Sequence, residues 1–179
     1  MNDFGTVTAP DTLRIERLLP GPIERVWAYL TESEKRGSWL ARGDMELRPG
    51  GSMELVFHND NLTENDVPAP AKYEKYGGEI RSHGHVLECE PPRLLVFSWD
   101  EENGGDSQVR MELTPQGDEV RLVLTHSRLA SRDGMISVAG GWHTHLGILA
   151  DRLAGRVPPG FWATHTRIAA EYERRIPAA

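Results

Sequence analysis

The chain has 179 residues, of which 39% are hydrophobic and 26% are charged, and these proportions exclude a disordered or fibrous protein. Its net charge is -7 and its 20 Lys and Arg residues are dispersed, so we expect no nucleic-acid partner. No apolar run approaches the roughly 20 residues that span a bilayer, and the polar N-terminus lacks a secretory core. A single cysteine, Cys89, fits a reducing compartment, so we expect a cytoplasmic protein. The lack of a long apolar run predicts no membrane span.

Length and composition together predict one domain with a single apolar core. We expect residues 1–10 to form a flexible N-terminal arm and residues 11–156 to form the domain. Residues 157–179 are expected to add a helix packed on that domain, and residues 59–78 to be an inserted loop within it.

The first part of the chain predicts a strand, two short helices and a hairpin. Apolar residues alternate over Thr12–Leu19, as in a strand, and Pro22 suits the first position of a helix ending at Leu30. A second short helix is expected over 33–40. Residues 45–58 then predict a β-hairpin that turns at 49–51.

The insertion, 59–78, contains two prolines, many turn-forming residues and no sustained periodicity. It is too long for a plain hairpin turn. Either it is a disordered surface segment, or it is a lid or binding loop at the mouth of a cavity.

Residues 94–100 predict a deeply buried strand, because two prolines at 91–92 block a helix and Phe97 and Trp99 then share one face. Gly84, inside the preceding strand, indicates a bulge or a close approach of another backbone. Antiparallel neighbours are expected over 79–89, 109–113 and 120–126.

Two helices complete the predicted order. Apolar residues recur at helical spacing over Val138–Leu153, and this long helix is expected to cover the sheet. The terminal helix, 159–175, has a broad apolar face that either packs on the chain itself, against Tyr73 and Tyr76, or joins two chains as a homodimer. That face comprises Phe161, Trp162, His165, Ile168, Ala169 and Tyr172.

These elements predict an α+β protein. We expect a curved antiparallel sheet wrapped around the long C-terminal helix, two short helices after the first strand, and an extra terminal helix. A sheet that grips a helix commonly leaves a cavity at one end.

Several short motifs, in order, resemble one known family. They are Pro22-x-x-x-Val26-Trp27-x-x-Leu30-Thr31, Trp39, Pro49-Gly50-Gly51, Glu90-Pro91-Pro92-Arg93-Leu94 with Trp99, and Gly141-Trp142-His143-x-x-Leu146. Over Leu13–Leu153 the chain is similar to the activator of heat-shock protein 90 ATPase homologue family, of the C-terminal-domain type. That family lies in the START, polyketide cyclase and birch-pollen-allergen (SRPBCC) superfamily. The resemblance implies a helix-grip fold, in a superfamily of cochaperones, lipid carriers, cyclases and stress proteins.

The aromatic residues predict either a solid core or a cavity, between the sheet and the long helix, for a small hydrophobic or aromatic ligand. The cavity is favoured because two histidines, His126 and His145, are odd in a dry core but suit a site that orients a ligand. The expected lining is Trp39, Phe57, Phe97, Trp99, Met111, His126, Trp142, His145, Leu146 and Leu149.

Two other functions stay open. A cyclase- or hydrolase-type enzyme would use His126 or His145 as acid or base, and a second titratable group within hydrogen-bond reach would mark it. A chaperone-associated module would need a docking face, for which the acidic stretch 100–106 is the one candidate.

A metal or cofactor site is not expected. His83 and His85 share a strand face and would need His126 to complete a site, and the next two histidines, His143 and His145, differ by about 200 degrees around a helix. No phosphate-binding or dinucleotide-binding glycine motif is present.

Overall fold

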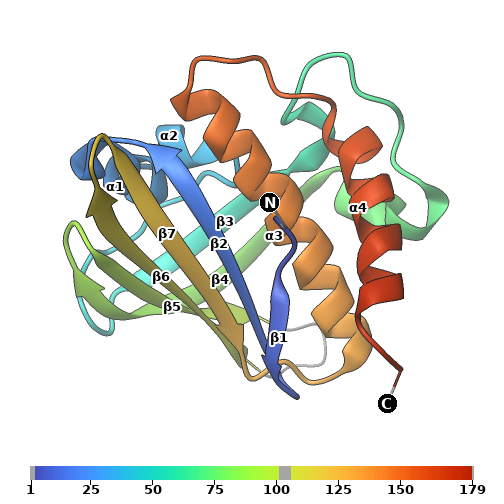
Figure 1. Cartoon of the computed structure of the whole chain (residues 1–179), viewed down its shortest axis with the longest axis horizontal. Coiled ribbons are helices and arrows are strands. Elements are labelled where there is room, and N and C mark those ends of the chain that lie inside the picture. Colours follow the sequence, from blue (N-terminus) through green and yellow to red (C-terminus); the bar gives the residue numbers. More distant parts are fainter. Residues whose placement is uncertain (1–2, 101–105, 179) are drawn as a thin grey trace.

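The computed structural model describes residues 3–100 and 106–178. Its α+β fold is a seven-stranded antiparallel sheet curved around one long helix, α3, Arg132–Leu153 (Figure 1). The other helices are α1, Ile23–Thr31; α2, Ser33–Gly37; α4, Phe161–Arg175; and the short 3-10 helices η1, Asn59–Asn61, and η2, Ala71–Tyr76. The strands are β1, Thr6–Ala9; β2, Thr12–Pro20; β3, Ser52–His58; β4, Glu79–Glu90; β5, Leu94–Asp100; β6, Asp106–Gln116; and β7, Glu119–Ser127.

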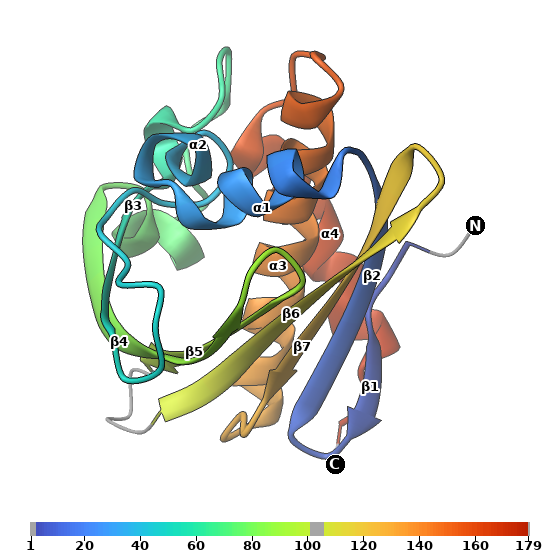
Figure 2. The ribbon, with the colours of Figure 1, turned by 90° about the vertical axis from the view of Figure 1, so that its left-hand side faces the viewer.

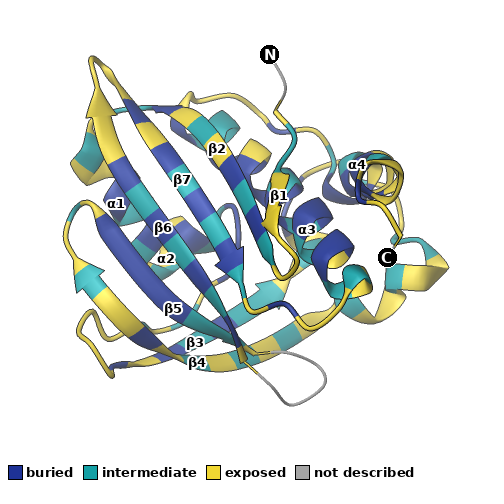
Figure 3. Cartoon of the chain, turned by 60° about the horizontal axis from the view of Figure 1, so that its bottom comes forward, coloured by how far each residue is buried: buried dark blue, intermediate teal, exposed yellow. Residues whose placement is uncertain are grey.

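The strands are ordered β1-β2-β7-β6-β5-β4-β3, and every neighbouring pair is antiparallel. Figure 2 shows the sheet bending around α3, and Figure 3 shows buried and exposed residues alternating along the strands. As predicted, β5 is deeply buried, because Leu94 to Phe97 are each at most 2% exposed.

Strand β4 changes partner halfway along its length. Its first half pairs with β3, from Glu79 to His85, and its second half pairs with β5 from Val86 onward. The predicted close approach at Gly84 is confirmed, since a Cβ atom there would lie 2.8 Å from the Ser98 Oγ and carbonyl oxygen of β5. The sheet therefore curls sharply at this point.

Helix α3 begins six residues earlier than the sequence predicts. Ser131 caps it, because its Oγ accepts a hydrogen bond from the Gly134 N–H at 3.0 Å. The first turn lacks a clear apolar stripe, so periodicity missed it. Beyond it, Trp142, Leu146 and Leu149 are at most 2% exposed, and each such burial contributes about 2 kcal/mol.

The N-terminal region is more ordered than predicted. Within the segment expected to be a flexible arm, Thr6–Ala9 form β1, which pairs with β2. The Gly5 N–H also donates to the Tyr172 hydroxyl at 2.7 Å, joining this segment to α4.

The predictions for two other elements, the second short helix and the hairpin, were also inaccurate. Helix α2 ends at Gly37, and the expected first arm of the hairpin forms only an isolated bridge between Met45 and Met53.

The insertion is ordered because it supplies the N-terminal cap of α4. Gly160, at the cap position, has no side chain to satisfy the first free N–H groups of the helix. Thr63 Oγ1 accepts from the Phe161 N–H at 2.8 Å, and Asp66 Oδ2 accepts from the Trp162 N–H at 2.8 Å. The Asp66 carboxylate also complements the positive end of the helix dipole. The disordered alternative for 59–78 is therefore wrong.

Candidate functional site

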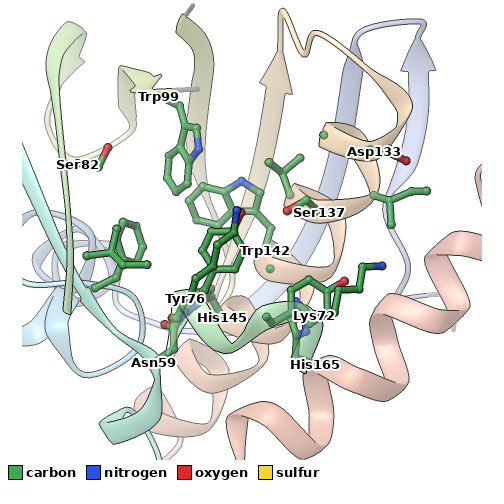
Figure 4. A pocket seen from close by; sticks show the side chains of 18 of the residues that line it. Asn59, Lys72, Tyr76, Ser82, Trp99, Asp133, Ser137, Trp142, His145 and His165 are labelled. Carbon is green, nitrogen blue, oxygen red and sulfur yellow. The ribbon is translucent and has the colours of Figure 1, made fainter. Parts of the chain in front are cut away.

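A cleft with a volume of about 770 Å³ lies beside α3 (Figure 4). One wall is α3, a second is the sheet at β4 and β5, and the insertion and α4 close the other sides. The residues that line it include Phe57, Asn59, Tyr73, Ser82, Trp99, Gly141, Trp142, His145, Phe161 and His165.

The curl of the sheet explains why the cleft opens where it does. Pairing between β4 and β5 stops at Val86 opposite Phe97. The cleft residues of β4, Ile80 to Ser82, lie beyond that point, and so do Trp99 and Asp100 of β5. Because β3 with the first half of β4 bends away from β5, the space between them is filled by side chains only in part.

Aromatic rings line the cleft. The Trp99 ring lies 5.2 Å from the Trp142 ring and 5.9 Å from the Phe57 ring, measured between centroids. Phe57 in turn lies 6.5 Å from His145, and the His145 ring lies 5.0 Å from Phe161. These separations are typical of tilted and edge-to-face aromatic contacts, and they leave flat apolar surface facing the cleft.

The insertion and α4 form the outer wall together. Tyr73 stacks on Trp162 at 6.2 Å and meets the edge of His165 at 4.8 Å. At the rim, the Lys72 Nζ pairs with the Glu173 carboxylate at 3.1 Å, and both side chains are more than half exposed. Trp162 and His165 are buried and Tyr73 is half-buried, so these ring contacts hold the wall more firmly than the exposed ion pair does.

His126 lies behind the cleft and is fully buried. The Trp142 Nε1–H donates to its Nδ1 at 3.0 Å, so the ring carries its proton on Nε2. That Nε2–H donates to the Ser107 Oγ at 2.6 Å, and the serine hydroxyl points to the Trp99 carbonyl. The serine oxygen therefore accepts a hydrogen bond from the histidine. In a serine nucleophile the hydroxyl instead donates its proton to the histidine, so this pair is not arranged for nucleophilic catalysis.

His145 and His165 reach the cleft itself and are each only 6% exposed. The His145 Nδ1 lies 2.8 Å from the Trp39 carbonyl oxygen, which can only accept, so the proton is on Nδ1 and Nε2 is a bare acceptor. Burial lowers the pKa of His145 to about 4 and that of His165 to about 4. Both rings are neutral at pH 7.

Known proteins confirm the fold. Residues 20–154 match the sequence model of the family described as Activator of Hsp90 ATPase homolog 1-like protein. The chain belongs to this family. No curated protein matches the sequence of this family member.

Solved structures agree. A Bordetella parapertussis protein, determined in solution, is 46% identical, with 99% of this chain and 92% of that one covered and a TM-score of 0.83. CalU16 from Micromonospora echinospora is 23% identical, with 93% and 89% covered and a TM-score of 0.69. DynU16 is 20% identical, with 85% of this chain and 51% of that one covered and a TM-score of 0.65. The helix-grip fold of this family member is thereby shown, and the family and the fold support a ligand-binding domain.

Four of the ten residues that the sequence assigned to a cavity line the cleft: Phe57, Trp99, Trp142 and His145. The other six are core residues that do not line it: Trp39, Phe97, Met111, His126, Leu146 and Leu149. The sheet and α3 pack closely here, so side chains fill the space at the centre of the sheet and the cleft lies to one side. Trp39, for example, is fully buried and donates to the Tyr29 carbonyl at 2.8 Å.

The sequence assignment missed the cleft residues outside the sheet and α3. Asn59 and Tyr73 come from the insertion, and Phe161 and His165 come from α4. The signal for them was the aromatic face of the terminal helix, which predicted burial against the insertion. That packing is observed for Tyr73, and the whole apolar face of α4 is buried within the chain.

The other site hypotheses gain no support. Within the described residues, neither His126 nor His145 hydrogen-bonds a second titratable group. Nor do three potential metal ligands gather anywhere in residues 3–100 and 106–178, and His83 contacts Glu54 at 3.1 Å instead. Most of the acidic stretch 100–106 lies outside the described residues. None of the described helices has the length and apolar character to cross a membrane.

Proposed function

We propose that this protein binds a small hydrophobic or aromatic molecule in the cleft between α3, the curled edge of the sheet, the insertion and α4. The observation that carries the proposal is the cleft itself, with a volume of about 770 Å³ and rings from β3, β5, α3 and α4 on its walls. Protein pockets for small organic ligands fall in the range of roughly 300–1,000 Å³.

The walls suit a flat apolar ligand. Trp99, Trp142 and Phe57 present ring faces and edges at aromatic contact distances from one another, so an aromatic molecule between them would continue the same packing. The charged residues that line the cleft lie at its rim, because all of them are exposed except the half-buried Arg132: Lys72, Lys75, Arg81, Asp100, Arg132, Asp133 and Glu173. A strongly charged ligand would lose its hydration without a buried partner.

The relatives fit a small-molecule ligand. DynU16 comes from the dynemicin biosynthetic locus, and it shares the fold of this chain over 85% of the length of this chain. This likeness is one of fold, so both the class and the identity of the ligand rest on the cleft residues.

Gly141 provides a direct test. It lines the cleft from α3, and a Cβ atom at this position has no other group within 4 Å. The Cβ of a Gly141→Leu variant therefore has room, the rest of its side chain should occupy part of the cleft, and helix propensity should add up to about 1 kcal/mol of stability. We expect the variant to lose at least tenfold in affinity for the uncharged fluorescent probe N-phenyl-1-naphthylamine and for naphthalene as its competitor, measured by fluorescence titration.

Gly147→Leu is the matched control. Gly147 lies on the exposed face of the same helix, also has nothing within 4 Å of a built Cβ, and does not line the cleft. This variant should bind both probes as the unchanged protein does. Equal binding by the Gly141→Leu variant, or no binding by the unchanged protein, would contradict the proposed function.

A further inference from the structure

The cleft holds unsatisfied hydrogen-bonding atoms at one end. In the described part of the chain, only two buried side-chain nitrogen or oxygen atoms lack a partner, and they are Asn59 Oδ1 and His165 Nδ1. Both residues line the cleft. A buried polar atom without a partner costs about 1–3 kcal/mol, and here two such atoms belong to residues that line one cleft, so this end of the cleft is short of hydrogen-bond partners.

His145, which also lines the cleft, adds an unused acceptor. Its Nδ1 proton is committed to the Trp39 carbonyl, so Nε2 offers a lone pair, and no described residue donates to it. His145 and His165 flank the same ring, Phe161, at centroid distances of 5.0 and 5.6 Å. Figure 4 shows Asn59, His145 and His165 on the side of the cleft away from Trp99.

The polarity of these atoms selects the ligand group. Asn59 cannot turn its amide over to present a donor, because its Nδ2 already donates to the Tyr76 carbonyl at 3.3 Å. Asn59 Oδ1 and His145 Nε2 are therefore both acceptors. They need donors from the ligand, and a carboxylate, which has only acceptors, would be repelled by both.

Resting on the proposed function, we infer that the ligand is an uncharged aromatic molecule with a hydroxyl group. Its ring lies toward Trp99 and Trp142, and its hydroxyl donates to His145 Nε2 or Asn59 Oδ1. His165 Nδ1, which is buried and free of a partner, provides a further contact to the same polar group.

Three naphthalene probes of similar shape test this inference: 2-naphthol, 2-methoxynaphthalene and 2-naphthoate. We expect 2-naphthol to bind about tenfold more tightly than 2-methoxynaphthalene, the difference of one well-formed hydrogen bond between neutral groups. We expect 2-naphthoate to bind most weakly. Titration calorimetry measures the affinities. Imidazole nitrogen chemical shifts show whether the Nε2 of His145 accepts a hydrogen bond from 2-naphthol but not from its methyl ether.

Asn59→Leu and His145→Phe remove the two acceptors while keeping similar shapes. Each should reduce the preference for 2-naphthol over its methyl ether, while affinity for the ether stays within twofold. His83→Gln, an exposed histidine outside the cleft, is the control. If His145→Phe fails to fold, Asn59→Leu and the nitrogen shifts still decide the outcome.

The outcomes separate the two proposals. Equal affinity for 2-naphthol and its ether, or a preference for 2-naphthoate, would overturn the hydroxyl inference and leave the proposed binding function standing. Failure of all three probes to bind, together with unchanged N-phenyl-1-naphthylamine binding in the Gly141→Leu variant, would overturn both.

Discussion

Two regions of this molecule bury histidines, and they differ in how the rings are satisfied. Behind the cleft, His126 has both nitrogens engaged, with Trp142 donating to one and Ser107 accepting from the other. In the cleft, His165 has a buried nitrogen with no partner, and His145 has one bare acceptor. In the first region every ring nitrogen has a hydrogen-bond partner within the core, whereas in the second region some ring nitrogens have none.

The difference teaches that burial alone does not mark a ligand site. All three rings are at most 6% exposed, and all three have pKa values lowered by burial. Only the count of satisfied atoms separates them. A structural histidine contributes to stability through its partners, and a ligand-ready histidine leaves part of its hydrogen-bonding capacity unused.

The largest expected effect is acid unfolding, which tests what the two regions share. Burial lowers the pKa of His126 to about 3 and those of His145 and His165 to about 4, whereas an unfolded histidine titrates near 6.5. The unfolded chain therefore binds protons first. Stability should be complete above about pH 6.5 and fall toward pH 4, by up to about 1.4 kcal/mol per pH unit for each ring.

Denaturant unfolding monitored at several pH values measures this slope. The slope reports how many more protons the unfolded chain binds than the folded one. Replacing His126 by Phe, or His165 by Phe, should lower that number by about one. A free energy of unfolding that does not change between pH 7 and pH 5 would show that these rings are not held neutral by burial.

The next effect separates the two regions. His126→Phe should cost about 2–3 kcal/mol of unfolding free energy at pH 7, because the Trp142 Nε1–H loses its acceptor and the Ser107 Oγ loses its donor. Both groups belong to residues that are only 2% exposed, so solvent does not readily replace the ring. A change below about 0.5 kcal/mol would mean that the network does not stabilise the core.

A smaller effect is expected from Asp66→Ala, which acts on the wall of the cleft. The carboxylate caps α4 through the Trp162 and Ala163 N–H groups, so its loss should cost about 1–2 kcal/mol. Hydrogen exchange should accelerate in the first turn of α4 and in the insertion but not around His126. Asp118→Ala, in the turn between β6 and β7, is the control for a surface carboxylate. Uniform loss of protection across the sheet would contradict this local role.

The smallest effect on stability should come from His165→Phe, the same substitution as His126→Phe but in the cleft. No bonded partner is orphaned and one unsatisfied nitrogen is removed, so the change should lie between zero and about 1 kcal/mol of added stability. Thermal unfolding of the two variants side by side measures the contrast. Equal destabilisation by both would remove the distinction between the two regions.

Local pattern in the sequence was enough to predict most of the fold. Alternating apolar residues located β2, β5, β6 and β7, and helical spacing located α3 and α4. The first turn of α3 was missed, because its signal is the Ser131 cap and not an apolar stripe. Strand β1 was missed because its residues are exposed at the edge of the sheet and carry no alternation.

The sequence by itself determined the fold class, the family and the set of aromatic residues from which the cleft is built, because these depend on local periodicity and on motifs read along the chain. Only the tertiary structure decided which of those residues form solid core and which face open space. That division depends on where β4 leaves β5 and on how the insertion caps α4. The capping contacts join Asp66 to Trp162, 96 residues apart in the chain, and Thr63 to Phe161, 98 residues apart. Hydrogen-bond satisfaction is likewise a property of packed neighbours, so His126 and His165 differ only once the chain is folded.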